Sequence, residues 1–356
     1  MPEDPLEAGK RREIERIYAL AEKQFGRGWI GSRKTRKSHI LLLLVTTLCV
    51  VIGFERSAFS EDQVFKWKTQ SVVTRPEGCY NRGMRYETIG KLQIQKIGFG
   101  TWQIGGQGSP DPSVDGKSIQ ALRSALELGY THFDTAEGYA AGHCEELVGQ
   151  VIRETGAKRE DLFITTKVSP DHLEYETVLR SCENSLRRLG MAYVDLYLIH
   201  WPKAGMRLEE TFRALNKLVR EGKVRHLGIS NFNLKLLKQS AALSETPLLT
   251  NQVPYSVLDR TYAKNGVLEY CQENEILLTA YSPVKPRNVK SNQVLKAVAA
   301  VHGASSQQIA LAWLAMQPRV ITIPMSFNPQ HQAENIQAVD LVLNEAEMES
   351  LNRIRS

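Results

Sequence analysis

The sequence predicts an α/β protein, a (β/α)8 TIM barrel with an N-terminal extension. From Met84 onward, short apolar strands alternate with helices through eight strand–helix units in about 270 residues. A doubly wound sheet is the competing fold, and it would need a GxGxxG turn between its first strand and first helix. The string GFGTWQIGGQG at residues 98–108 is out of register for that turn, and no helix follows it directly. The barrel is therefore favoured.

The predicted elements follow in order along residues 84–356. A hairpin at 86–89 and 93–95 precedes a first barrel strand near 96–100. The later strands end at Asp134, Lys167, His200, Ser230, Gln252, Tyr281 and about Ile323. Helices are predicted near 114–128, 144–154, 175–189, 208–221, 234–243, 266–274, 292–301, 306–316 and 330–354.

Residues 1–83 form the extension, and their pattern differs from that of the barrel. The apolar segment 40–54 has 15 residues, fewer than the ~20 that span a bilayer. Basic residues precede it and small residues follow it, as in a signal peptide. Three interpretations remain open: a membrane anchor, a targeting segment, or a leader that is not part of the working protein. In the last case a chain starting at Met84 is expected to be soluble and fully active.

The composition gives no reason to expect a nucleic-acid partner or a metal site. The formal net charge is +6, but residues 1–83 hold 15 Lys and Arg against 10 Asp and Glu, whereas residues 84–356 hold 30 against 29. Neither a disulfide framework nor zinc binding is predicted, and a reducing compartment is the simplest fit. The five cysteines show no CxxC or Cys/His spacing: Cys49, Cys79, Cys144, Cys182 and Cys271.

Four polar residues are predicted to meet at one end of the barrel. Asp134, Lys167 and His200 close three strands, and Tyr139 follows the first of them by five residues. In a parallel barrel the carboxyl ends of neighbouring strands share one mouth, with neighbouring strands about 4.8 Å apart. An acid, a phenol, an ammonium and an imidazole would then form a site that can donate a proton.

At these positions the chain resembles the aldo-keto reductase family. The resemblance covers essentially all of 84–356 and none of 1–83. It is carried by strings that occur in order at strand ends: 98–102 (GFGTW), 133–139 (FDTAEGY), 166–168 (TKV), 199–202 (IHWP), 228–232 (GISNF), 251–253 (NQV) and 280–282 (AYS).

The resemblance implies reversible hydride transfer between NAD(P)H and a small aldehyde or ketone. It makes Tyr139 the general acid and gives His200 the task of orienting the carbonyl oxygen. An ammonium lowers the pKa of a nearby phenol, which suits Lys167, and Asp134 would keep that ammonium charged and in place. Taken singly, these residues also fit a structural ion pair, a packed tyrosine and a core histidine.

Further residues match the family's cofactor and substrate contacts. Ser230, Asn231 and Gln252 match the residues that bind the nicotinamide carboxamide, and Tyr281 matches the ring that stacks on the nicotinamide. Glu334 and Asn335 match an adenine-contacting pair. The other predicted cofactor contacts are Ser282, Ser326 and His331, and the predicted walls of the substrate pocket are Trp102 and Trp201.

The cofactor preference between NADP(H) and NAD(H) is left open by a departure from the family. Met325 and His331 stand where many members carry a Lys and an Arg that contact the 2′-phosphate of NADPH, and no Lys or Arg occurs in 325–333. Losing two charge-assisted hydrogen bonds costs roughly 10²–10⁴ in affinity, so relaxed or reversed preference is expected. The helix N-terminus could still bind the phosphate.

Two alternatives to a soluble enzyme stay open. A nicotinamide-binding regulatory subunit on the same fold would sense redox state, and turnover assays separate it from an enzyme. A membrane-tethered enzyme requires that segment 40–54 is retained. A cytoplasmic location is expected, because an exported domain would be cut off from the cell's nicotinamide pool. The short loops around the mouth suit varied small aldehydes and ketones.

Overall fold

The computed structural model describes residues 86–284 and 286–354. The extension at 1–83, its apolar segment 40–54 and the predicted boundary at Met84 lie outside these ranges. Within the described ranges, no helix is both long enough and apolar enough to cross a bilayer.

The described residues form one small hairpin and one eight-stranded sheet. The hairpin pairs β1 (Tyr86–Ile89) with β2 (Leu92–Gln95) in antiparallel fashion. The eight remaining strands are parallel and neighbour one another in chain order, as predicted. They are β3 (Phe99–Gly100), β4 (His132–Asp134), β5 (Phe163–Val168), β6 (Val194–Ile199), β7 (Val224–Ser230), β8 (Thr250–Pro254), β9 (Leu277–Tyr281) and β10 (Val320–Thr322).

The first and last strands close the sheet into a barrel. The Thr322 N–H donates to the Lys96 carbonyl at 2.7 Å, and the Gly98 N–H donates to the Thr322 carbonyl at 2.8 Å. A Cβ at Gly100 would stand 2.5 Å from the Ile323 carbonyl oxygen. Gly100 is therefore needed where the two edges approach, because only glycine leaves room for the backbone of the last strand.

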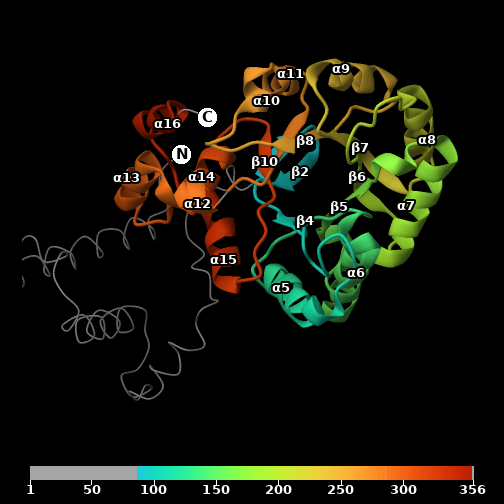
Figure 1. The fold of residues 1–356 in the computed structure, drawn as a ribbon, viewed down its shortest axis with the longest axis horizontal. Coiled ribbons are helices and arrows are strands. Elements are labelled where there is room, and N and C mark those ends of the chain that lie inside the picture. Colours follow the sequence, from blue (N-terminus) through green and yellow to red (C-terminus); the bar gives the residue numbers. More distant parts are fainter. Residues whose placement is uncertain (1–85, 285, 355–356) are drawn as a thin grey trace, which may run out of the picture. The chain divides into compact units, whose positions relative to one another are not determined.

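The helices surround the strands, as Figure 1 shows. Apolar side chains fill the layer between helices and sheet, including Phe99, Phe133 and Tyr197. The buried Cys144, Cys182 and Cys271 are free. The helices are α5 (Asp115–Glu127), α6 (His143–Thr155), α7 (Tyr175–Leu189), α8 (Leu208–Arg220), α9 (Leu234–Leu243), α10 (Thr261–Lys264), α11 (Val267–Glu273), α12 (Pro286–Ser291), α13 (Gln293–His302), α14 (Ser306–Ala315), α15 (Pro329–Gln337) and α16 (Glu345–Asn352).

Two predictions about the C-terminal elements are wrong. The expected helix at 330–354 is interrupted: α15 ends, a 3-10 turn follows at Ala338–Asp340, and Leu341 is extended. A new helix, α16, then starts because Asn344 forms a capping box with Glu347. In addition, the segment after Pro283 was expected to stay a loop until about residue 292, but α12 already lies there.

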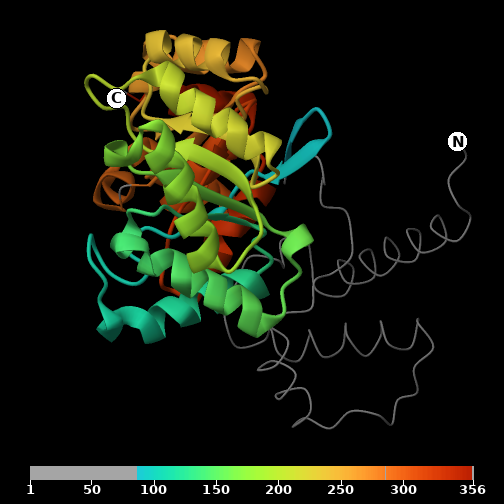
Figure 2. The same ribbon diagram turned by 90° about the vertical axis from the view of Figure 1, so that its right-hand side faces the viewer.

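The hairpin covers the amino-terminal end of the barrel. Figure 2 shows it standing off one end of the strands. Ile94 packs in a cluster with Phe163 and Leu196, and Ile89 and Leu92 lie against the same cluster. Because this end is filled by apolar side chains, the polar strand ends at the opposite mouth are left to form a site.

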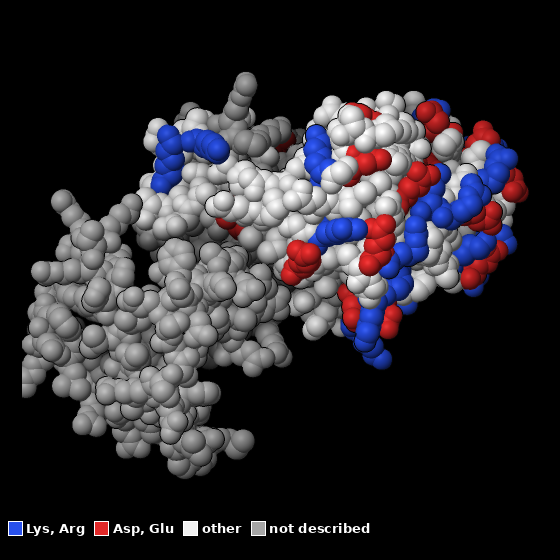
Figure 3. Space-filling view, turned by 90° about the horizontal axis from the view of Figure 1, so that it is seen from below, with Lys and Arg blue, Asp and Glu red and all other residues white. Residues whose placement is uncertain are grey.

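The described surface carries both signs of charge. On the face shown in Figure 3, acidic and basic side chains are interspersed rather than gathered by sign. Exposed ion pairs such as Arg123–Glu154 and Lys203–Asp171, each at 2.6 Å, are of the kind that contributes at most about 1 kcal/mol. This face therefore has no strong single-sign field.

Candidate active site

Lys167 is the centre of the candidate site. Its side chain is fully buried in β5, and its Nζ donates to Asp134 Oδ1 at 2.5 Å, to the Thr135 carbonyl at 2.8 Å and to the Tyr139 hydroxyl at 3.2 Å. An ammonium has three N–H donors, so all three are satisfied. The predicted meeting of acid, ammonium and phenol is present, with the ammonium between the other two.

Strand register explains why Asp134 and Lys167 meet. Asp134 pairs with Thr165 across β4 and β5, and Lys167 lies two residues further along β5. Side chains two apart point to the same face of a strand, so these side chains turn toward the barrel interior together. Asp134 is 1% exposed. A buried charge of this kind is tolerated because its partner and hydrogen bonds compensate for lost water.

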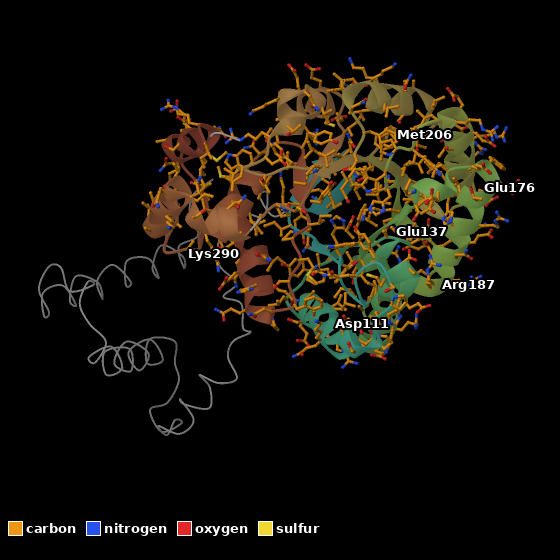
Figure 4. The ribbon with its side chains drawn as sticks, in the orientation of Figure 1. Asp111, Glu137, Glu176, Arg187, Met206 and Lys290 are labelled. Atoms are coloured by element: carbon orange, nitrogen blue, oxygen red, sulfur yellow. The ribbon has the colours of Figure 1, made fainter. Side chains whose placement is uncertain are left out.

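Tyr139 reaches the site from a strained turn. Ala140, Ala141 and Gly142 have positive φ values of 46°, 51° and 95°, which are costly for the two alanines. Glu137, which is labelled in Figure 4, fixes the approach to this turn. Its Oε1 accepts from the Ser169 N–H at 2.6 Å and lies 2.8 Å from His172 Nδ1. The loop after β4 is therefore tied to the loop after β5, which holds Tyr139 beside Lys167.

His200 follows β6 and completes the predicted group of four. Its ring lies 5.7 Å from the Tyr139 ring, edge to face, and its carbonyl accepts from Asn231 Nδ2 at 3.0 Å. Burial lowers the pKa of His200 to about 3, and the Lys167 charge acts in the same direction. The imidazole is therefore neutral near pH 7 and has one N–H to offer.

The Tyr139 phenol does not behave as the sequence predicted. Burial raises the pKa of Tyr139, and the nearby Lys167 ammonium, which lowers that pKa, does not offset burial. Burial also lowers the pKa of Lys167, but the Asp134 carboxylate raises it further, and the net direction is upward. The expectation of a phenol more acidic than free tyrosine is therefore wrong. At neutral pH the site holds a protonated phenol beside a charged ammonium.

A second group of polar side chains adjoins these four at the ends of β7, β8 and β9. Ser230 Oγ donates to the Gln252 carbonyl at 2.9 Å, and the Tyr281 hydroxyl donates to Asn231 Oδ1 at 2.9 Å. Asn231 has a φ of 66°, a conformation that asparagine tolerates better than most residues. Gln252 Nε2 donates to Asp134 Oδ2 at 2.7 Å. The structure thus joins Ser230, Asn231, Gln252 and Tyr281 to the acid.

The remaining predicted contacts lie on other segments. Ser282 is exposed with a φ of 49°. Ser326 precedes α15, and its Oγ accepts from the Asn328 N–H at 3.1 Å. Glu334 Oε1 accepts from Gln330 Nε2 at 3.2 Å within the same helix. His331 is exposed on α15, and Asn335 is buried there. These four residues of the last segment form a region of their own.

The two tryptophans that were predicted to line the substrate pocket are both about half exposed. Trp102 is 49% exposed, and its ring lies 5.1 Å from the Tyr139 ring. Trp201 directly follows His200 and is 47% exposed. Large apolar side chains left this exposed beside a polar cluster are typical of a binding surface.

Three functional contacts were not foreseen from the sequence. The Thr135 carbonyl accepts from Lys167, which no side-chain pattern can reveal. The Glu137–His172 contact was open to inference, because Glu137 lies inside the string that contains Asp134 and Tyr139. The bond between Gln252 and Asp134 joins residues 118 positions apart and needs the closed barrel.

The fold and the site together define the class of protein. A closed parallel barrel with a phenol, an ammonium and an imidazole at one mouth belongs with the barrel oxidoreductases. The chain is a member of the aldo/keto reductase family, whose model matches residues 96–356. The resemblance seen in the sequence is confirmed.

Relatives and solved structures support this membership. A methylglyoxal reductase of Escherichia coli is 34% identical over 270 residues, covering 74% of this chain and 92% of the relative. A glyoxal reductase of Bacillus subtilis is 36% identical over 238 residues, covering 67% and 83%. A thermostable aldo-keto reductase in complex with epalrestat superposes with a TM-score of 0.72 at 44% identity, covering 75% and 98%. A Klebsiella pneumoniae aldo/keto reductase in complex with NADP and acetate gives a TM-score of 0.69 at 33% identity, covering 76% and 95%.

Proposed function

We propose that this protein reduces small aldehydes, 2-oxoaldehydes among them, with a nicotinamide cofactor, and that the barrel from Met84 onward carries the activity. One observation carries the proposal: a single buried ammonium contacts both the Asp134 carboxylate and the Tyr139 hydroxyl. A structural ion pair would not need a phenol at the edge of the site as its third partner. The donors and acceptors of Ser230, Asn231 and Gln252 fit a nicotinamide carboxamide, which needs both.

A bound nicotinamide cofactor would supply the hydride. Negative charge then develops on the carbonyl oxygen of the aldehyde, and the neutral His200 imidazole can donate its N–H to that oxygen. The protonated Tyr139 hydroxyl delivers the proton. As the phenol loses its proton, the Lys167 ammonium at 3.2 Å stabilises the phenolate, and Asp134 keeps Lys167 charged.

The relatives and the mouth of the barrel support the proposed substrate class. The matched proteins include reductases of methylglyoxal and glyoxal, and Trp102 and Trp201 offer apolar surface on which a small aldehyde can rest. We expect turnover of methylglyoxal and glyoxal with NADPH in a spectrophotometric assay, alongside a panel of larger aldehydes and ketones. Tight cofactor binding without turnover of any carbonyl compound would instead identify a regulatory subunit.

The cofactor preference rests on the segment after β10. Residues 325–333 carry no Lys or Arg. However, α5 lies beside α15 (Figure 1), and it brings the Lys117 ammonium to 4.9 Å from the centre of the Phe327 ring. A cation from another helix therefore lies beside the segment 325–333, which has none of its own. We propose that both NADPH and NADH serve, with Lys117 providing the remaining preference for NADPH.

Lys117→Met is expected to lower kcat/KM for NADPH roughly tenfold and to leave kcat/KM for NADH unchanged. A lysine–phosphate hydrogen bond contributes about 1.5–3 kcal/mol, and only NADPH carries the 2′-phosphate. The measurement is kcat/KM for both cofactors with one aldehyde. The matched control is Lys235→Met, an exposed lysine on α9. An equal loss with both cofactors, or a thousandfold NADPH preference that survives Lys117→Met, contradicts the proposal.

A further inference from the structure

Gln252 is connected to the site in two ways. Its side chain is 3% exposed, and its Nε2 donates to Asp134 Oδ2 at 2.7 Å, while Lys167 occupies the other oxygen of the same carboxylate at 2.5 Å. Its backbone carbonyl accepts from Ser230 Oγ and from the Asn231 N–H, each at 2.9 Å. Gln252 is therefore fixed at its backbone and bonded to the acid through its side chain.

The chemistry of the acid decides how this amide is oriented. A carboxylate only accepts hydrogen bonds, so the NH2 group of Gln252 must face Asp134 and the carbonyl oxygen must face away. Among the described residues none donates to Gln252 Oε1. This oxygen is also not among the side-chain atoms that are fully buried without a hydrogen-bond partner. The amide thus presents an open acceptor on the side away from the ion pair.

We propose that Gln252 is a positioning residue that couples carboxamide recognition to the Asp134–Lys167 pair. This inference rests on the proposed function. Gln252 Oε1 accepts an N–H of the nicotinamide carboxamide while Nε2 holds Asp134. Hydrogen bonds in a chain polarise one another, so occupation of the acceptor strengthens the bond to the carboxylate. Cofactor binding thereby reinforces the charge that keeps Lys167 protonated beside Tyr139.

The coupling must also act in reverse. If Asp134 sets the direction of the Gln252 amide, a neutral residue at position 134 releases that constraint. An asparagine can pair with either end of the glutamine amide, so the acceptor is no longer held toward the carboxamide. Asp134 would then influence recognition of the carboxamide through Gln252, as thermodynamic linkage requires.

The test measures binding rather than turnover. Isothermal titration calorimetry compares NADP+ with the analogue in which an acetyl group replaces the carboxamide, which keeps the carbonyl but lacks the N–H donors. We expect wild-type protein to prefer NADP+ about tenfold, the worth of one hydrogen bond. Gln252→Leu should abolish the preference, and Asp134→Asn should reduce it at least threefold. The readout is the ratio of the dissociation constants of the two ligands, so a substitution that weakens the binding of both equally leaves it unchanged.

A matched control is available at the amino-terminal end of the barrel, away from the candidate site. Gln95 is another buried glutamine, with Nε2 donating to the Gly129 carbonyl and Oε1 accepting from the Thr131 N–H, both at 2.8 Å. Gln95→Leu should lower stability and keep the tenfold ratio. In addition, Gln252→Leu should lower kcat about tenfold at saturating NADPH with the KM for aldehyde unchanged.

The outcomes separate this inference from the proposed function. A folded Asp134→Asn protein that keeps the wild-type ratio overturns the coupling, as does a Gln252→Leu enzyme with unchanged kcat. Both results leave the reductase activity standing. Failure of wild-type protein to bind NADP+ and NAD+ at all would instead overturn the proposed function.

Discussion

Tyr139→Phe is expected to lower kcat/KM for aldehyde reduction by roughly 10²–10⁴ while the Kd for NADPH changes little. The substitution removes only the hydroxyl that delivers the proton, and general acids contribute about this much to a rate. The ring contacts to Trp102 at 5.1 Å and to His200 at 5.7 Å remain, so the mouth keeps its shape. Steady-state kinetics and a cofactor titration on the same preparation measure both quantities.

A matched control for this experiment is Tyr193→Phe. Tyr193 lies outside the site, between the guanidinium groups of Arg159 and Arg225 at 4.0 and 3.8 Å from its ring centre. Removing its hydroxyl should leave both kcat/KM and cofactor affinity unchanged. Turnover of Tyr139→Phe close to the wild-type value would refute the assignment of Tyr139 as the general acid.

Lys167→Met is expected to abolish measurable reduction and to destabilise the fold by about 3–5 kcal/mol. The ammonium is the centre of the site, so its loss removes the stabilisation of the Tyr139 phenolate. It also leaves the Asp134 carboxylate buried with Gln252 as its side-chain donor. Urea unfolding measures the free energy of unfolding, and the aldehyde assay measures the rate.

A double variant separates folding from chemistry. Asp134→Asn/Lys167→Met removes both charges, so the penalty of one uncompensated buried charge disappears and part of the free energy of unfolding should return. Activity should not return, because the phenol still lacks its cation. A Lys167→Met protein that is as stable as wild type, or a double variant that reduces aldehydes, would contradict this account of the site.

Much of the fold was open to prediction because barrel strands and helices have local signatures. The predicted helices at 175–189 and 234–243 agree with α7 and α9 to the residue. Strand ends were predicted to within two residues at Asp134, Lys167, Ser230 and Gln252. The break after α15 was missed because the capping box at Asn344 competes with helical spacing that continues across it.

Some features of the candidate site could likewise be predicted from the sequence, and others could not. That Asp134, Tyr139, Lys167 and His200 share a mouth follows from strand ends in a parallel barrel, and the structure places them together. The proximity of Lys117 to Phe327 joins α5 to the segment before α15, about 200 residues along the chain, and no local pattern contains it. The hydrogen bond from Gln252 to Asp134 likewise forms only when the strands close into a barrel.

The sequence by itself determined the barrel, the order of its strands and the identity of the four polar side chains at its mouth, because periodicity and strand ends are local properties. Only the tertiary structure decided the direction of the Tyr139 pKa, the orientation of the Gln252 amide and the source of a cation beside Phe327. The physical reason is that burial and long-range partners set these properties. Desolvation of Tyr139 outweighs the ammonium 3.2 Å away, and its extent is fixed only when the loops after β4 and β5 come together.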